Sequence, residues 1–98
     1  MKVYVSFAAL EFRQHLPYDQ REAIFDMPEQ STVRDAVGLI SERVGMDVQG
    51  LLRSKKVVLM FRNRMTNLER DGKVELVDGD RFVFINPLIR GSEWEGRW

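Results

Sequence analysis

The strongest constraint on the fold is a change in hydrophobic period near residue 32. Within residues 32–44, apolar side chains recur at intervals of three and four residues, as on one face of an α-helix. They are Val33, Ala36, Val37, Ile40 and Val44. Thr32 can act as the N-cap, Asp35 occupies the acidic position of a capping box, and Gly45 suits the left-handed residue that ends a helix. The sequence therefore predicts one main helix whose two ends are set by local signals.

Segments on both sides of this helix follow the period of two that is typical of β-strands. Residues 2–8 and 21–27 alternate before the helix. Residues 56–62 form a nearly continuous apolar run, which indicates an interior strand covered on much of both faces. A short edge strand at 64–66 and a last strand at 81–86 complete the set.

The predicted order is strand, strand, helix, strand, short strand, strand. We expect a wide loop at 11–20 and a short irregular or single-turn segment at 46–54. The 98 residues suffice for one domain, predicted at 1–91, with 92–98 as a flexible C-terminal extension. If the last strand lies beside the first, the result is an α+β fold: a mixed sheet of four to five strands with one main helix across one face. That is the β-grasp, or ubiquitin-like, fold.

Composition excludes several function classes. Fifteen Lys and Arg residues balance fifteen Asp and Glu residues, which argues against nucleic acid or an anionic membrane as a partner. The absence of cysteine excludes disulfides, thiolate metal sites and a cysteine nucleophile. His15, the single histidine, cannot form a His-rich metal site. No apolar run approaches the roughly 20 residues that span a bilayer. We expect a cytoplasmic protein without metal or cofactor, and we find no constellation that indicates an enzyme.

The end of the last strand carries a more specific pattern. A Leu-x-Asp-Gly-Asp turn at 76–80 runs into the apolar strand, then into Pro87 and a glycine tail. Together with the opening stretch 3–8 and the helix start 31–36, this ending resembles the small β-grasp sulfur carriers. That family includes the small subunit of molybdopterin synthase and the thiamine-biosynthesis sulfur carrier. The resemblance spans roughly residues 1–91.

The resemblance implies a carrier function that resides in the C-terminal tail. In the family, ATP activates the C-terminal glycine carboxylate as an acyl adenylate on a partner of the ubiquitin-activating type. Sulfur then displaces the adenylate, and the resulting thiocarboxylate donates sulfur to a pterin (molybdopterin or tungstopterin) or a thiazole precursor. The implied partners are the activating enzyme and a larger synthase subunit or sulfur-accepting enzyme. The carrier itself catalyses nothing.

The chain departs from the family pattern in this tail. Aligning the ending on 87–91 places Arg90 where the family has its penultimate glycine, and leaves 92–98 beyond Gly91. Three explanations remain open: a protease exposes Gly91, residues 92–98 are foreign to the natural chain, or the carrier chemistry is lost. The last would leave a non-covalent ubiquitin-like interaction module. Trp94 and Trp98 either fold back onto the sheet, dock into another protein or remain disordered.

The resemblance and the strand pattern together give candidate site residues. The carrier-tail residues are Arg90 and Gly91, and the partner-binding residues are Phe7, Phe82, Phe84, Pro87, Leu88 and Ile89. Phe7 matches a family position on the exposed sheet face, whereas its alternation with the first strand's valines favours the core. In the last strand, Phe82 and Phe84 share one face and Val83 and Ile85 the other. One pair must face the helix, and the other is left on the open face, where an apolar patch indicates a partner.

A basic segment precedes an acidic one in the second half of the chain. The basic residues are Arg53, Lys55, Lys56, Arg62 and Arg64, and the acidic residues are Glu69, Asp71, Glu75, Asp78 and Asp80. Two interpretations remain: an electrostatic dipole that orients a partner, or solvated strand ends and loops that neutralise one another.

Overall fold

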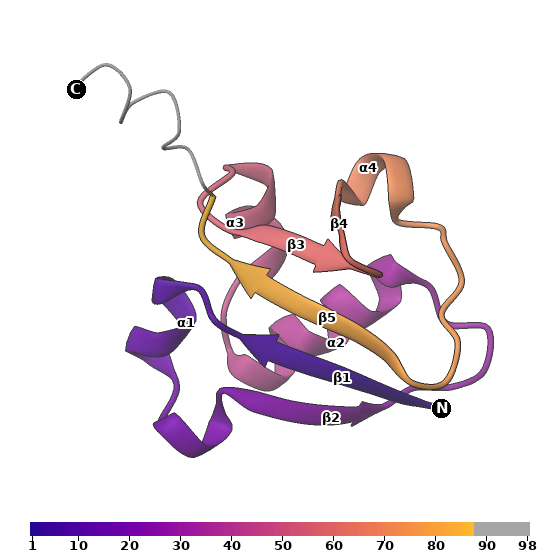
Figure 1. Cartoon of the computed structure of the whole chain (residues 1–98), viewed down its shortest axis with the longest axis horizontal. Helices are drawn as coiled ribbons and strands as arrows, with labels where there is room; N and C mark the ends of the chain where they lie inside the picture. Colours follow the sequence, from indigo (N-terminus) through magenta and orange to yellow (C-terminus); the bar gives the residue numbers. More distant parts are fainter. Residues whose placement is uncertain (88–98) are drawn as a thin grey trace.

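A five-stranded mixed sheet organises the chain, with the strand order β2-β1-β5-β3-β4 (Figure 1). The computed structural model describes residues 1–87. The strands are β1 (Lys2–Phe7), β2 (Glu22–Asp26), β3 (Val58–Phe61), β4 (Arg64–Thr66) and β5 (Asp80–Ile85). Strand β5 runs parallel to β1 in the middle of the sheet, and the other pairs are antiparallel. The last strand thus lies beside the first, which confirms the predicted β-grasp arrangement.

Helix α2 (Val33–Val44) crosses one face of this sheet (Figure 1). The Asp35 backbone N–H donates to the Thr32 hydroxyl over 3.3 Å, and the Asp35 carboxylate accepts from the Thr32 backbone N–H over 3.0 Å. Gly45 ends the helix at φ 69°, in the left-handed region that a residue without Cβ enters easily. The predicted helix, capping box and C-terminal glycine are therefore confirmed.

The hydrophobic core lies between α2 and the sheet. Its largest fully buried side chains are Phe7, Phe12, Phe82, Phe84, Ile40, Leu59, Val3, Val33, Val37, Val48 and Val57. Phe7, Phe12 and Phe84 form an aromatic cluster with ring centroids 4.9 to 5.8 Å apart. Rings at this spacing contribute beyond their buried area.

Short helices fill two connections that are expected from the sequence to be largely irregular. The expected loop at 11–20 instead contains α1 (Leu10–His15) and a 3₁₀ turn at Tyr18–Gln20. The prediction of a loop is wrong because Phe12 and Leu16, four residues apart, are both buried and anchor a helical turn to the core. Helix α3 (Val48–Arg53) is the expected short segment after α2.

The second half of the chain differs from expectation at two points. Strand β3 is buried on one face only: Leu59 and Phe61 face the core, whereas Val58 and Met60 are half-exposed. The Asp71-Gly72 pair is of a type that favours a turn, but here it is the end of a further short helix, α4 (Leu68–Asp71). None of the helices within residues 1–87 is long and apolar enough to cross a membrane.

Candidate functional site

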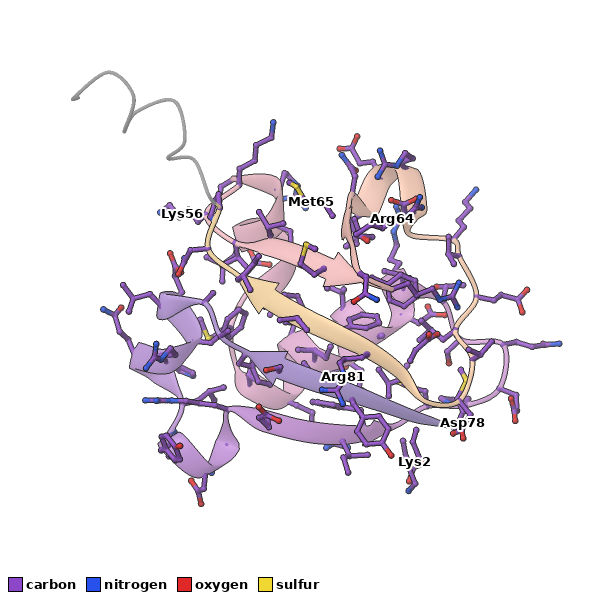
Figure 2. All side chains as sticks on the ribbon, viewed as in Figure 1. Lys2, Lys56, Arg64, Met65, Asp78 and Arg81 are labelled. Carbon is purple, nitrogen blue, oxygen red and sulfur yellow. The ribbon has the colours of Figure 1, made fainter. Side chains whose placement is uncertain are left out.

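The sheet face opposite α2 carries a continuous apolar patch. Figure 1 shows α2 behind the sheet and no helix of residues 1–87 in front of the strands. We define the open-face patch as Val58, Met60, Met65, Val83 and Ile85. Met60 pairs with Val83 on one side and Met65 on the other, and Val58 pairs with Ile85, so these residues are direct cross-strand neighbours. Met65 is 64% exposed and is labelled at the surface in Figure 2. A contiguous apolar surface of this kind is typical of a protein-interaction site.

The structure corrects three candidate partner contacts. Phe7, Phe82 and Phe84 are exposed to 2%, 0% and 0%, so they belong to the core and do not lie on the open face. The alternative assignment of Phe7 to the core is confirmed. In β5 the bulky phenylalanines fill the space under α2, and the smaller Val83 and Ile85 take the open face.

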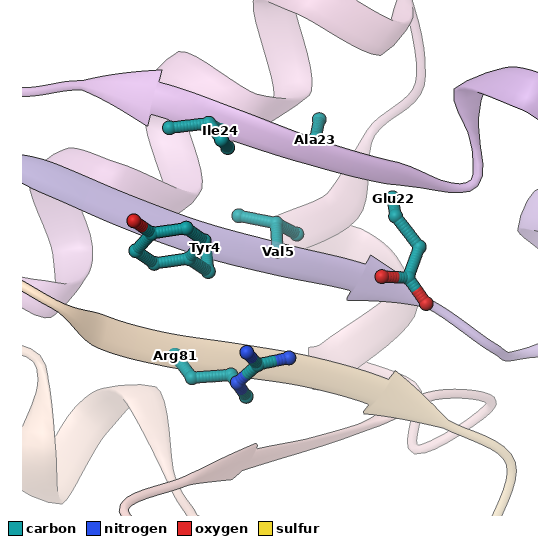
Figure 3. Close-up of a pocket in the computed structure, with 6 residues that line it drawn as sticks. All are labelled: Tyr4, Val5, Glu22, Ala23, Ile24 and Arg81. Carbon is teal, nitrogen blue, oxygen red and sulfur yellow. The ribbon is translucent and has the colours of Figure 1, made fainter.

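The other half of the open face has a mixed polar and apolar character. Tyr4 lies between Ile24 on β2 and Arg81 on β5, in one row across three strands (Figure 3). The Arg81 guanidinium lies 5.8 Å from the centroid of the Tyr4 ring, a cation–π contact. A shallow pocket of about 430 Å³ is lined by Tyr4, Val5, Glu22, Ala23, Ile24 and Arg81. The pocket contains one carboxylate, from Glu22, and one guanidinium, from Arg81.

The basic and acidic segments contact one another near the β3–β4 hairpin. Arg62 donates to both carboxylate oxygens of Asp80, over 3.1 and 3.0 Å. Arg64 and Arg70 pair with Asp71 over 3.4 and 2.9 Å. Mutual neutralisation therefore holds for Arg62–Asp80 and Arg64–Asp71, although these two carboxylates are buried and not solvated as expected. The ion pairs hold the hairpin and α4 in place, and they leave the open-face patch free of these carboxylates.

Asp71 is the most strongly held of these carboxylates. Its side chain is 8% exposed and accepts hydrogen bonds from the Arg70 guanidinium over 3.0 and 2.9 Å and from the Asn67 backbone N–H over 3.1 Å. The Arg70 hydrogen bond, the Asn67 N–H and the charges of Arg70 and Arg64 lower the pKa of Asp71. The carboxylate is therefore ionised and structural at neutral pH.

The chain leaves the sheet at Asn86, and this residue makes several contacts. Its Oδ1 accepts from the Leu10 backbone N–H over 2.8 Å. Its Nδ2 donates to the Glu11 carboxylate over 2.8 Å and to the Lys56 carbonyl over 3.3 Å. Lys56 is labelled near this end of β5 in Figure 2. Sequence reasoning missed Asn86, although a lone asparagine between an apolar strand and a proline was a visible signal.

The remaining candidate residues separate into two groups. Pro87 is half-buried and follows Asn86 directly. Leu88, Ile89, Arg90 and Gly91 lie outside the described residues, as do the two tryptophans of the extension.

Neither His15 nor any acidic group indicates a metal centre in the described part of the chain. His15 is exposed, and its Nε2 lies 2.8 Å from the Val44 carbonyl oxygen at the end of α2. Residues 1–87 contain no cluster of three or more His, Cys, Asp or Glu side chains that could hold a metal ion.

Comparisons with known proteins agree with this architecture. No family model matches the chain. An uncharacterized protein of Archaeoglobus fulgidus is 33% identical over 91 residues, covering 93% of this chain and 100% of the relative. Among solved structures, a putative molybdopterin converting factor subunit 1 from Pyrococcus furiosus has a TM-score of 0.64 at 23% identity, covering 89% of this chain and 98% of its own. The small archaeal modifier protein 1 of Haloferax volcanii has a TM-score of 0.59 at 12% identity, covering 88% and 97%.

The Archaeoglobus relative matches along its whole length, and the two solved structures match over nearly all of theirs. The chain therefore belongs to one family with the Archaeoglobus fulgidus protein and has the ubiquitin-like β-grasp fold of molybdopterin converting factor subunit 1 and the small archaeal modifiers.

Proposed function

We propose that this protein is a sulfur carrier whose C-terminal carboxylate is activated by a partner enzyme and converted to a thiocarboxylate. The sulfur would serve molybdopterin or tungstopterin cofactor biosynthesis, or thiamine biosynthesis. The partners are an adenylating enzyme and a larger synthase subunit or sulfur-accepting enzyme, in the cytoplasm. The chain itself catalyses no step: it presents a carboxylate to the active sites of others.

The proposal depends on one observation: the chain leaves the sheet next to the open-face patch. Ile85 is both the last residue of β5 and a member of the open-face patch, and Asn86 and Pro87 follow at once. A partner that covers the patch therefore meets the end of β5 and Asn86 at the edge of the same interface. This geometry suits a carrier, because binding energy from the patch can hold the carboxylate in a partner's active site.

The tail residues enter the proposal from the sequence. Residues 1–91 form the carrier domain, and the carboxylate of Gly91 reacts once residues 92–98 are removed. A glycine without Cβ can pass through a narrow channel to a nucleotide. Arg90 is larger, so the partner's channel must be wide enough for a guanidinium at this position. An Arg90→Gly variant should be adenylated by the cognate enzyme at least as well as the parent.

Intact-mass spectrometry tests the carrier function directly. The full chain and a form ending at Gly91 are incubated with ATP, Mg²⁺, a sulfide source and the cognate activating enzyme. A form ending at Arg90 serves as the matched control. We expect the Gly91 form, and no control, to gain the mass of an adenylate and then of a thiocarboxylate. If neither the full chain nor the Gly91 form gains mass as adenylate, thiocarboxylate or conjugate, the carrier function is refuted.

A second candidate function is a non-covalent interaction module. The open-face patch favours it, because an apolar surface can bind a partner without any chemistry at the tail. A pull-down experiment tests this candidate. It compares capture of the partner by the parent protein, by Val83→Asp and by a form ending at Pro87. Tyr18→Asp, a charge at an exposed site on the 3₁₀ turn and outside the open-face patch, is the control. A module requires that Val83→Asp lose the partner while the shortened form keeps it; equal capture by all forms removes this candidate.

A further inference from the structure

The side chain of Asn86 connects the end of β5 to two segments that are far away in the sequence. Leu10 and Glu11 open α1, 76 and 75 positions earlier, and Lys56 precedes β3, 30 positions earlier. The three hydrogen bonds are 2.8, 2.8 and 3.3 Å long. Asn86 is thus hydrogen-bonded to α1, which follows β1, and to the segment before β3; β1 and β3 are the two strands that flank β5.

The contacts match the chemistry of a carboxamide. The oxygen accepts from a backbone N–H, and both amide hydrogens find an oxygen acceptor. The acceptor role is needed because the first N–H groups of a helix lack intrahelical partners, and the N-cap residue of α1, Ala9, has no side chain that could accept. Asn86 therefore caps α1 from the far end of the chain.

The backbone on either side of Asn86 is restricted as well. The Phe84 carbonyl accepts from the N–H groups of Ala8 and Ala9, over 2.9 and 2.8 Å. Pro87 disfavours the helical region for the residue before it, which restricts the backbone of Asn86. Side-chain and backbone contacts together hold the chain in place from Phe84 to Asn86.

We infer that Asn86 is a positioning residue, which sets the direction in which the C-terminal segment leaves the sheet beside the open-face patch. Its consequence for catalysis by a partner rests on the proposed carrier function. The directional role itself does not, so the two can fail separately.

The directional role is measured by spin labelling. The chain has no cysteine, so Arg53→Cys on α3 and Leu88→Cys provide the two label sites in the full chain. Double electron–electron resonance then gives the distance distribution between them. We expect Asn86→Ala to broaden this distribution and to speed exchange of the Leu10 amide hydrogen at least tenfold. An unchanged distribution in Asn86→Ala overturns the inference, whatever the partner assay shows.

Two further variants separate direction from general destabilisation. Asn67→Ala removes the cap of α4, where Oδ1 accepts from Glu69 and Arg70, at a site away from β5. This control should leave the distribution unchanged. Asn86→Asp combined with Glu11→Gln reverses the donor and acceptor of the contact with residue 11 and keeps the bond to Leu10; it gives up only the longer bond to the Lys56 carbonyl, to which a carboxylate cannot donate. The double variant should narrow the distribution relative to Asn86→Ala; failure to do so would assign the effect to something other than these hydrogen bonds.

The consequence for the partner is measured as steady-state adenylation of the Gly91 form. Ordering a segment in advance of binding is worth roughly two- to tenfold in affinity. We expect Asn86→Ala to raise the KM for the carrier by that factor with kcat nearly unchanged, and Asn67→Ala to alter neither. An unchanged KM in a protein that is adenylated normally overturns the partner part of the inference. No adenylation of the parent would instead refute the carrier function and leave the spin-label result standing.

Discussion

Adjacent residues of β5 should respond very differently to truncation to alanine. Phe84 is fully buried and packs against Phe7, Phe12 and Phe82, with ring centroids at 5.8, 5.4 and 6.4 Å. Val83 is half-exposed on the other face of the same strand. The contrast between Phe84→Ala and Val83→Ala therefore tests which face of β5 belongs to the core.

The expected magnitudes follow from burial. Replacing a buried phenylalanine by alanine lowers the free energy of unfolding by about 3–5 kcal/mol. Removing the half-exposed side-chain carbons of Val83 should cost less than about 1 kcal/mol. A domain of this size is stable by about 5–15 kcal/mol in total. Phe84→Ala thus removes a large share of the stability, and Val83→Ala a small one.

Urea unfolding followed by circular dichroism measures both effects. With an m value of about 1.5 kcal/mol/M, the midpoint should fall by about 2–3 M for Phe84→Ala and by less than about 0.7 M for Val83→Ala. Phe84→Leu keeps most of the volume and should fall between them, which retains a measurable transition if the alanine variant unfolds. Equal shifts for Phe84→Ala and Val83→Ala, or a larger one for Val83→Ala, would refute the face assignment and with it the open-face patch.

Three further measurements test the cap, the buried carboxylate and the patch. Thr32→Ala should lower the free energy of unfolding by about 1 kcal/mol in urea, because the capping box loses its hydroxyl acceptor. Because the pKa of Asp71 is lowered in the fold, its stabilising effect is present at neutral pH and is lost as pH falls from about 5 through the lowered value. Asp71→Asn should therefore be less stable at pH 7 and show a shallower loss of stability in acid titrations; a parallel curve would contradict this. Met60→Asp should weaken partner capture with little change in the urea midpoint, since Met60 is half-exposed.

The elements with strong periodicity were predictable from the sequence. Strand β1 alternates cleanly, and α2 has an apolar stripe, a capping box and a terminal glycine. The Asp-Gly-Asp turn at 78–80 leads into β5 as expected, and Gly79 adopts φ 91° in this turn. Local signals of this kind survive in the fold because they agree with the tertiary contacts.

The faces of β5 were not predictable, because both alternating pairs are apolar. Hydrophobic pattern alone cannot decide whether Phe82 and Phe84 or Val83 and Ile85 face the helix. The choice depends on volume, since the cavity under α2 accommodates two phenyl rings next to Phe7 and Phe12. Volume complementarity involves residues far apart in sequence, so the pattern of one strand does not reveal it.

Helix α1 was missed for a related reason. Its two buried anchors, Phe12 and Leu16, are surrounded by exposed polar residues. Six residues are too few for local propensity to form a stable helix. The helix depends instead on packing of Phe12 against the aromatic cluster and on the Asn86 hydrogen bond to Leu10.

The central position of β5 gives the proposed carrier a mechanical property that an edge strand would lack. Strand β5 is hydrogen-bonded to β1 on one side and to β3 on the other. If a partner displaces the C-terminal segment, the strand can detach only if both ladders and the Phe82 and Phe84 contacts break together. An edge strand such as β4 is hydrogen-bonded to one neighbour, so it detaches when a single ladder breaks. Positions 80–86 therefore contribute to the core and to the open-face patch and supply the anchor at Asn86, so that a partner can hold the C-terminal segment without unfolding the domain that presents it.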